Sequence, residues 1–284
     1  MIIINGSLGP IVFPIPPSFA TGCTFDPPED AEKPDWRLDT VQSVMSVQVT
    51  NGEIDLEPTF LGVSNQFQYP SCTANAGADH WEQVTINDFL KQGMPLEEAK
   101  AQVPDYSRLW IWWQSRNMMW PNKTQDIESG SFLRLVFNVI ARFGVPPETL
   151  WPYTADPRQQ PSIKAQRAAF ANICKAFYKI TGSASEKHDQ ILKCLQDGRS
   201  VAMASCLEKA YGSYTGGVFP WHKSASKPMN HAQVIAGWSE SMQAYKIRNS
   251  WSASWGLNGY AWVQKECVTE DSHALWAGFR GIPQ

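Results

Sequence analysis

The first group in this sequence that could do chemistry is a cysteine preceded by a glutamine at a distance of six residues. Cys72 opens the small-residue run CTANAGAD, which predicts a helix beginning at or near it. The amino end of a helix carries about half a positive charge and lowers the pKa of a thiol, so a cysteine there can act as a thiolate nucleophile. An amide donor at Gln66 could meet an oxyanion. The alternative is a buried thiol that only packs, which is the commoner fate of a cysteine.

A histidine and an asparagine follow much later in the chain. His231 enters the apolar run HAQVIAGW, 159 residues after Cys72, and Asn249 stands in the segment IRNSWSASWGLNGY. A single cysteine with a distant His and Asn is a candidate set for thiol hydrolysis, in which the histidine moves protons. The alternative for His231 alone is a half-buried imidazole with satisfied hydrogen bonds. The pattern of Asn, Trp and Gly around Asn249 is hard to assign to packing alone.

These segments resemble the papain family of cysteine peptidases. Residues 247–260 match the family pattern I-x-N-S-W-x-x-x-W-G-x-x-G-Y at every fixed position, and the other two segments match its Q-x5-C and H-A-x-x-x-x-G spacings. Residues 129–131 resemble the glycine-containing edge of the family's cleft, and residues 147–153 resemble its P-E-S-x-x-P-Y link between lobes. The resemblance runs from about Pro34 to Phe279.

The resemblance implies a role for each candidate residue. Cys72 would attack the scissile carbonyl and form an acyl-enzyme, and His231 would protonate the leaving amine and then activate water. Asn249 would orient the imidazole, and Trp251 would shield that contact from water. Gln66 and the backbone N–H of Cys72 would form the oxyanion hole.

The same resemblance implies a peptide or protein substrate bound in extended form. Gly130 would offer its backbone to an added strand, and Ser131 and Asn230 would flank the substrate. Leu133 and Met229 would line the pocket for the second residue before the cut, which predicts an apolar preference there. Core packing is an equal alternative for Leu133. The resemblance implies no cofactor, and the five scattered histidines argue against a metal site.

The sequence departs from the family at several points. The family signature is C-G-[SA]-C-[WY], whereas this chain has Tyr69 at the first cysteine and Thr73 at the aromatic position. Tyr69 removes a cysteine that pairs in relatives, so that disulfide cannot form. The Cys72-to-His231 separation slightly exceeds the 130–150 residues expected, which insertions in the helical half would explain. These features resemble the bacterial and phage branch of the family.

The spacing of apolar residues predicts the elements that position these groups. A helix is predicted over Phe132–Phe143 with Gly144 as its stop, and further helices over 163–178 and 188–195. The segment 104–113 reads as buried, and a strand is plausible at 41–49. Short strands are predicted at 200–204, 232–236, 243–247, 259–263 and 274–279.

This order of elements predicts an α+β protein. The resemblance sharpens that expectation to a papain-like two-lobe fold, with a helical lobe, an antiparallel β-barrel-like lobe and the active-site cleft between them. We expect a peptidase domain over residues 36–284, mainly helical over about 56–150 and mainly β over about 151–284.

Residues 1–35 are rich in proline and carry an acidic run from Asp26 to Glu32. Such sequence favours an extended path over a helix. One interpretation is a plain structural terminus. The sharper hypothesis is a segment that lies in the cleft and restrains activity or is trimmed on maturation, because it stands where a pro-region would.

Composition narrows the classes of function and the compartment. The formal net charge is −3, so the basic footprint of a nucleic-acid-binding protein is absent. The most apolar stretch, residues 1–20, contains four prolines and no Lys or Arg precedes Lys33, which predicts neither a membrane span nor a signal peptide. With six cysteines in no disulfide-dense pattern, we expect a cytoplasmic protein with free thiols.

Two alternatives to an endopeptidase remain open from the sequence. One is an exopeptidase or transpeptidase on the same fold, which would not cut blocked peptides internally. The other is a non-catalytic binding protein that retains the scaffold, although a decayed site usually loses one of its key residues.

Overall fold

The computed structural model describes residues 2–6, 9–13, 23–27, 29, 35, 37–38, 52–120 and 127–280 of the chain. The strand predicted at 41–49 lies outside these residues. Near the amino terminus, β1 (Ile2–Gly6) and β2 (Gly9–Phe13) pair as an antiparallel ribbon. The segments at 23–38 contact the rest of the chain through individual bridges and side chains.

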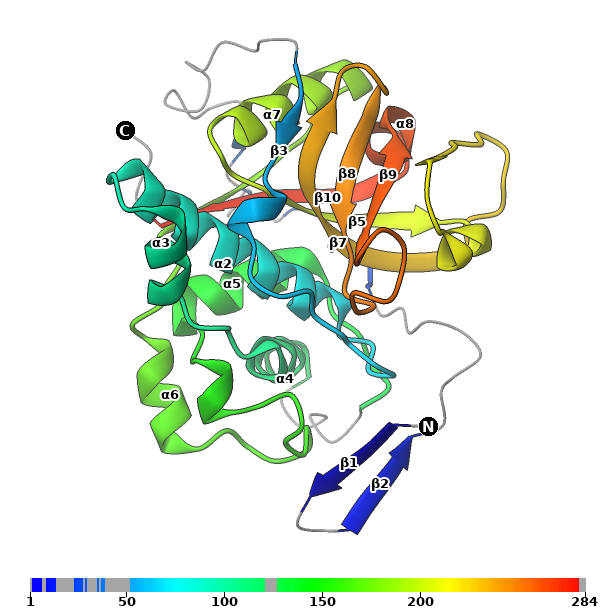
Figure 1. Ribbon diagram of the computed structural model, residues 1–284. Coiled ribbons are helices and arrows are strands. Elements are labelled where there is room, and N and C mark those ends of the chain that lie inside the picture. Colours follow the sequence, from blue (N-terminus) through cyan, green and yellow to red (C-terminus); the bar gives the residue numbers. More distant parts are fainter. Residues whose placement is uncertain are drawn as a thin grey trace.

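The helices divide between two lobes (Figure 1). Helices α2 to α6 gather on one side, and α7 and α8 lie against the sheet on the other. Their bounds are α2 Cys72–Lys91, α3 Leu96–Gln102, α4 Arg108–Met119, α5 Leu133–Phe143, α6 Ile163–Ala169, α7 Ala184–Gln196 and α8 Lys265–Thr269.

The second lobe is built on one sheet in the order β4-β10-β5-β7-β8-β9-β6, with β3 added to β7. All of its pairings are antiparallel except that of β6 with β9. The strands are β3 Ile54–Asp55, β4 Ala176–Lys179, β5 Val201–Leu207, β6 Val218–Phe219, β7 Met229–Ser239, β8 Ala244–Arg248, β9 Tyr260–Gln264 and β10 Ser272–Phe279.

The expectation of a barrel-like second lobe is wrong in one respect, because the described sheet does not close. Closure requires the two outermost strands to pair. Among the described strands, β4 at one edge pairs with β10 alone, apart from a single bridge between its Lys179 and Arg37, and the short β6 at the other edge pairs with β9 alone. The expected α+β class and the two-lobe division are otherwise confirmed.

Helix α2 lies between the two lobes and contacts both of them. It packs against α4 and α5 on one side and against β7, β5 and β10 on the other. Every residue from Cys72 to Asn87 is buried. The small residues of its first turns permit this, since a Cβ on Gly77 would stand 2.3 Å from Val136 Cγ1. The run CTANAGAD thus lets α5 pack closely against α2.

The predicted helices are confirmed except for one that is too long. Helix α5 ends at Gly144, whose φ of 67° is the left-handed backbone that glycine adopts readily. Helix α7 begins with a capping box made by Ser183 and Glu186. The helix predicted over 163–178 is wrong beyond Ala169, because residues 176–179 pair with β10 as strand β4. Pairing with a distant strand overrides the local helical pattern there.

Candidate active site

Cys72 is the first residue of α2 and has no exposed surface. The carbonyl oxygen of Ser71 accepts from the backbone N–H groups of Ala74 and Asn75, both at 3.0 Å, and so starts the helix. Cys72 therefore lies at the amino end of α2, where the partial positive charge of the helix favours an anion.

Gln66 lies six residues earlier in a loop, and its side-chain amide is held at both ends. Its Nε2 donates to the carbonyl oxygen of Tyr69 at 3.1 Å, and its Oε1 accepts from Ser250 Oγ at 2.7 Å. These two partners fix the orientation of the amide, because its C=O and NH₂ groups have nearly the same shape and only their hydrogen bonds distinguish them. The amide hydrogens of Gln66 therefore lie on the side of the Tyr69 carbonyl, and the amide oxygen lies on the side of Ser250.

The structure brings His231 and Asn249 together, the two residues that the sequence predicts to act as proton carrier and orienting group. His231 Nε2 lies 2.8 Å from Asn249 Oδ1, which also accepts from the backbone N–H of Ser250 at 2.8 Å. Asn249 Oδ1 is thus the acceptor, so the proton of a neutral His231 sits on Nε2. Nδ1 of His231 is buried and makes no hydrogen bond within the described part of the chain.

Two further features act on the imidazole. Trp251 stacks on it with ring centroids 4.5 Å apart and an interplanar angle of 21°. Burial lowers the pKa of His231 to about 4, although its hydrogen bond to Asn249 favours the charged form. In this enclosed arrangement His231 is neutral at pH 7.

The loop carrying Gln66 pairs along the segment that carries Asn249. The backbone N–H of Gln66 donates to the carbonyl oxygen of Ser250 at 2.9 Å, and that of Ser252 donates to Ser64 at 3.0 Å. An antiparallel bridge joins Asn65 and Trp251 between them. These contacts place the predicted oxyanion donor beside the residue that orients His231.

Arg248 ties the same segments to α2, and sequence reasoning missed it. Its Nε donates to Asp79 Oδ2 at 2.9 Å, and its Nη2 donates to the carbonyl oxygen of Gly62 at 2.6 Å. Asp79 also accepts from Ser64 Oγ at 3.3 Å. Arg248 is 1% exposed, and the adjacent Asp79 carboxylate holds its pKa above the ordinary value despite burial. The sequence signal that could have indicated it is the position of Arg248, a charged residue at the end of the strand AYKIR.

The cleft edge predicted at residues 130–133 is in contact with the amino-terminal segment. Cys23 forms a parallel bridge with Ser131, and the backbone N–H of Thr24 donates to the carbonyl oxygen of Ser131 at 2.8 Å. Cys23 is buried in the same apolar cluster as Cys72 and Leu133. Its pKa is raised well above the ordinary value by burial first and by the neighbouring Cys72 second.

Charged side chains anchor the same segment beyond the cleft edge. Asp26 accepts from the backbone N–H of Arg134 at 3.0 Å and from Trp276 Nε1 at 2.8 Å, so it caps the first turn of α5 from outside the helix. Asp35 forms ion pairs with Arg134 and with Lys179. Asp26 of the acidic run and Asp35 just after it therefore both anchor the amino-terminal segment to the globular part.

The remaining residues predicted to contact the substrate lie near the start of α5 and at the start of β7. Leu133 is the first residue of α5 and fully buried. Met229 and Asn230 begin β7 and are half-buried, as is Gly130. Asn230 Oδ1 accepts from His273 Nε2 at 2.7 Å, and the ring of His273 lies 4.1 Å from that of Phe25. His273 carried no sequence signal.

A model of the papain family cysteine proteases matches residues 123–274, just over half of the chain. The chain belongs to the papain family of cysteine proteases. The matched range contains His231 and Asn249, and the start of α2 lies before it. The family membership makes the chain a cysteine protease domain.

Individual relatives agree with this family over more of the chain. The uncharacterized peptidase C1-like protein L477 of Acanthamoeba polyphaga mimivirus is 26% identical over 245 residues, which are 80% of this chain and 73% of that protein. The crystal structure of xylellain, a cysteine protease from Xylella fastidiosa, superposes with a TM-score of 0.76 at 21% identity, over 96% of this chain and 100% of xylellain.

A similar structure determined as a proform is procathepsin L 3 of Tenebrio molitor larval midgut. It superposes with a TM-score of 0.64 at 16% identity, over 84% of this chain and 75% of that one. At these identities the structures show the fold, which is the two-lobe papain fold. Two negative findings apply to the described residues alone: none of their helices is long and apolar enough to cross a membrane, and they contain no cluster of His, Cys, Asp and Glu suited to a metal ion.

Proposed function

We propose that this chain is a thiol endopeptidase in which Cys72 is the nucleophile and His231 carries the proton. One observation supports this most strongly. His231 donates through Nε2 to Asn249 and keeps Nδ1 unpartnered among the described residues. That tautomer reserves the basic nitrogen for a thiol, as a cysteine peptidase requires. His80 differs in this respect, because both of its ring nitrogens have partners, Ser200 and the backbone N–H of Gly278.

In this mechanism the thiolate of Cys72 attacks the carbonyl carbon of the scissile bond. The amide of Gln66 and the backbone N–H of Cys72 stabilise the negative oxygen that forms. His231 gives its proton to the leaving amine as the carbon–nitrogen bond breaks, which leaves an acyl-enzyme. It then takes a proton from water, which attacks the thioester and releases the acid.

Asn249 and Trp251 serve His231 and do not contact the substrate. Asn249 fixes the ring orientation, and Trp251 keeps water from that hydrogen bond. The low pKa of His231 belongs to the enclosed arrangement, because burial is its main cause. Opening the cleft removes that penalty, so the pKa rises and a thiolate–imidazolium pair becomes accessible.

The amino-terminal segment, residues 1–35, restrains the enzyme by covering the cleft. Cys72 and His231 have no exposed surface, and the Ser131 carbonyl that would bind a substrate backbone already accepts from Thr24. The peptidase domain is then residues 36–284, with a mainly helical part over about 56–150 and a mainly β part over about 151–284.

Substrate preference follows from the cleft edge once the segment has left. Gly130 and Ser131 offer backbone groups to an extended peptide, and Asn230 contacts the same substrate. Leu133 and Met229 are both part of, or packed on, the apolar cluster that holds Cys23. A substrate with an apolar side chain at the second position before the cut replaces Cys23 there.

The proposal extends to the compartment and the branch of the family. All six cysteines are free thiols, which supports a reducing, cytoplasmic environment. Tyr69 at the position of the family's paired cysteine supports the bacterial and phage branch.

Hydrolysis of a fluorogenic peptide blocked at both ends tests the activity. The full chain, a variant beginning at Pro34, and Cys72→Ala versions of both are compared. We expect internal cleavage that requires Cys72 and is faster in the shorter variant. Cleavage only of unblocked peptides would indicate an exopeptidase, and no Cys72-dependent cleavage in either length would indicate a non-catalytic scaffold.

The same comparison tests the restraint by residues 1–35. Mass spectrometry of the full chain before and after the assay shows whether its amino terminus is intact. Equal rates for the two lengths, with an intact terminus, would contradict the covering role.

A further inference from the structure

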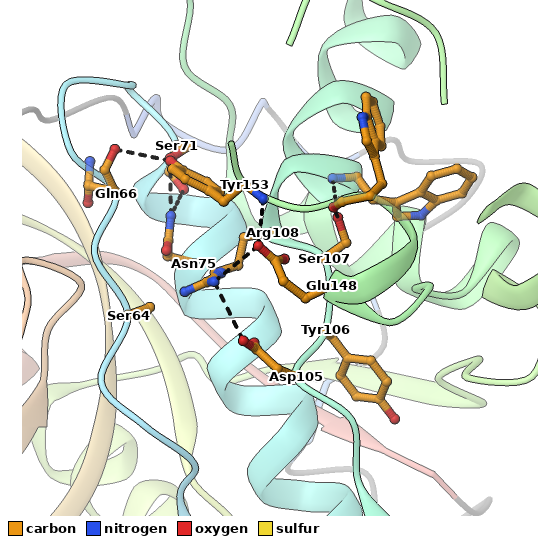
Figure 2. Close-up of polar contacts among 12 residues, drawn as sticks. Ser64, Gln66, Ser71, Asn75, Asp105, Tyr106, Ser107, Arg108, Glu148 and Tyr153 are labelled. Atoms are coloured by element: carbon orange, nitrogen blue, oxygen red, sulfur yellow. Dashed lines mark hydrogen bonds and ion pairs between the residues drawn. The ribbon is translucent and has the colours of Figure 1, made fainter. Parts of the chain in front are cut away.

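A buried chain of hydrogen bonds joins the residue before the nucleophile to the predicted oxyanion donor (Figure 2). Asn75 Nδ2 donates to Ser71 Oγ at 3.1 Å, and Ser71 Oγ lies 2.5 Å from the hydroxyl of Tyr153. That hydroxyl donates to the carbonyl oxygen of Gln66 at 3.0 Å. All four residues are buried.

The direction of this chain follows from the number of hydrogens available. Tyr153 has one hydroxyl hydrogen and gives it to Gln66, whose carbonyl can only accept. The hydroxyl of Ser71 must then donate to Tyr153, and Ser71 Oγ in turn accepts from Asn75. The three hydrogen bonds therefore run in one direction, from Asn75 through Ser71 and Tyr153 to Gln66, and hydrogen bonds arranged in this way strengthen one another.

Tyr153 is itself held firmly on the opposite side (Figure 2). Its backbone N–H donates to Glu148 Oε1 at 2.6 Å, and the guanidinium of Arg108 lies 5.4 Å from the centre of its ring. Arg108 also pairs with Glu148 at 3.3 Å. The hydroxyl is therefore a fixed point on the helical lobe, to which the loop from Gln66 to Ser71 is attached.

The loop needs such an attachment because it has no covalent one. Tyr69 is in the middle of it, and Cys72 is a free thiol. The Tyr69 ring packs on Trp112 at 5.2 Å and on Tyr153 at 5.9 Å. Apolar ring contacts hold the loop against the lobe, but they do not set the distance between the Gln66 and Cys72 backbones. Backbone hydrogen bonds fold the loop itself, from Tyr69 N–H to the Gln66 carbonyl at 3.2 Å and from Ser71 N–H to the Tyr69 carbonyl at 2.8 Å. The hydrogen bonds through Tyr153 fix the folded loop to the helical lobe and to the residue before Cys72.

We propose that Tyr153 is a positioning residue for the oxyanion site, its hydroxyl setting the separation of Gln66 from the amino end of α2. The inference rests on the proposed function, since it needs Gln66 to act in transition-state stabilisation. Tyr153 touches no substrate. Loss of its hydroxyl leaves the Gln66 carbonyl with the longer hydrogen bond from the backbone N–H of Tyr69, at 3.2 Å. The loop can then shift relative to α2, which weakens stabilisation of the oxyanion more than binding of the substrate.

The variant Tyr153→Phe tests this, because it keeps the ring and removes only the hydroxyl. Small displacements of a catalytic donor cost up to about 100-fold in rate, so we expect kcat to fall about 10- to 100-fold with KM nearly unchanged. A peptide aldehyde, which forms a tetrahedral adduct on Cys72, should lose affinity by the same factor as kcat/KM. Alkylation of Cys72 by iodoacetamide forms no oxyanion and should stay close to the parent rate.

Tyr106→Phe is the matched control. Tyr106 is buried in the same lobe, and its hydroxyl donates to Asn172 Oδ1 at 3.2 Å, away from the loop. The Tyr106→Phe variant should lose about as much unfolding free energy, measured in urea, as Tyr153→Phe does, but its kcat should not change. Ser71→Ala breaks the chain one link earlier and keeps the Tyr153–Gln66 bond, so a smaller fall in kcat is expected. It also provides a test if Tyr153→Phe does not fold.

The measurements use the full chain and the full chain with Asp26→Ala and Asp35→Ala, which removes two anchors of the covering segment. Two results would overturn the positioning role. One is a Tyr153→Phe variant in which the rate of alkylation falls together with kcat and aldehyde affinity. The other is a fall in kcat that is no larger in Tyr153→Phe than in Tyr106→Phe. If neither parent hydrolyses peptide or is alkylated at Cys72, the proposed function fails, and this inference fails with it.

Discussion

His231 and Asn249 lie on one side of the candidate site, and Cys72 and Gln66 on the other, and the two sides are built differently. His231 lies within β7, whose register with β5 and β8 is set by backbone hydrogen bonds, and Asn249 follows directly after β8. Cys72 and Gln66 lie at a helix end and in a loop, where a few backbone hydrogen bonds are supplemented by buried hydroxyl and amide groups.

The difference indicates where the site tolerates substitution. A strand pairing survives the change of one side chain, because the backbone groups remain paired. A loop that depends partly on single buried hydroxyl and amide groups is more easily displaced when one of them is removed, since the partner group loses a hydrogen bond in a buried place. The nucleophile side should therefore be the more sensitive side.

The largest effect is expected where α2 is joined to the sheet. In Asp79→Ala the guanidinium of Arg248 stays buried without its carboxylate partner, which is 2.9 Å away in the intact protein. Removing one member of a buried ion pair typically costs about 3–5 kcal/mol of unfolding free energy. Urea denaturation measures this.

Asp156→Ala is the control for that experiment. Asp156 pairs with Arg158 at 3.5 Å on the surface, so its loss should cost less than about 1 kcal/mol. Equal losses in the two variants would mean that the Arg248 contact does not hold the two lobes together.

The next effect concerns catalysis on the nucleophile side. Gln66→Ala removes a donor to the oxyanion, which typically lowers kcat by about 100- to 1000-fold. Hydrolysis of the blocked peptide measures it. Gln68→Ala, two residues on in the same loop, should stay near the parent rate. A Gln66→Ala enzyme with normal kcat would remove this residue from the mechanism.

The smallest effect is expected where α2 contacts the sheet, and it depends on pH. His80 of α2 accepts from the backbone N–H of Gly278 at 2.8 Å, and burial lowers its pKa to about 3. The unfolded chain binds this proton near pH 6.5, whereas the folded chain does not until about pH 3. The stability contribution is therefore complete above pH 6.5 and is lost as the pH falls.

Between pH 7 and 5.5 this single group should lower the unfolding free energy by about 1 kcal/mol. His80→Gln keeps a donor and an acceptor but does not titrate, so its unfolding free energy should fall by about 1 kcal/mol less over the same interval. His231, with its own lowered pKa, contributes equally to both proteins. Identical pH slopes would contradict a neutral, buried His80.

Much of the histidine side could be predicted from the sequence. The pattern around Asn249 is local, and the short strand-like runs predicted at 232–236 and 243–247 lie within β7 and overlap most of β8, respectively. The start of α2 at Cys72 was also evident, because small residues and a preceding turn mark a helix end. These features depend on neighbours within a few positions along the chain.

The rest depends on contacts between distant residues, which no local pattern encodes. Asp26 caps a helix 108 residues away, and Arg248 finds Asp79 at a separation of 169. Strand β4 looked helical because its pairing with β10 lies at the far end of the chain. The Tyr153 hydroxyl, 82 residues from Ser71, belongs to the same class.

The central claim is that Cys72 is an activated nucleophile served by His231. Labelling with an epoxide that alkylates papain-like thiols, followed by peptide mapping, tests it most directly, with the chain beginning at Pro34 beside the full chain. We predict a single adduct on Cys72, absent in Cys72→Ala and strongly slowed in His231→Ala. No adduct on Cys72 in either length, or labelling spread evenly over the six cysteines, would contradict the account.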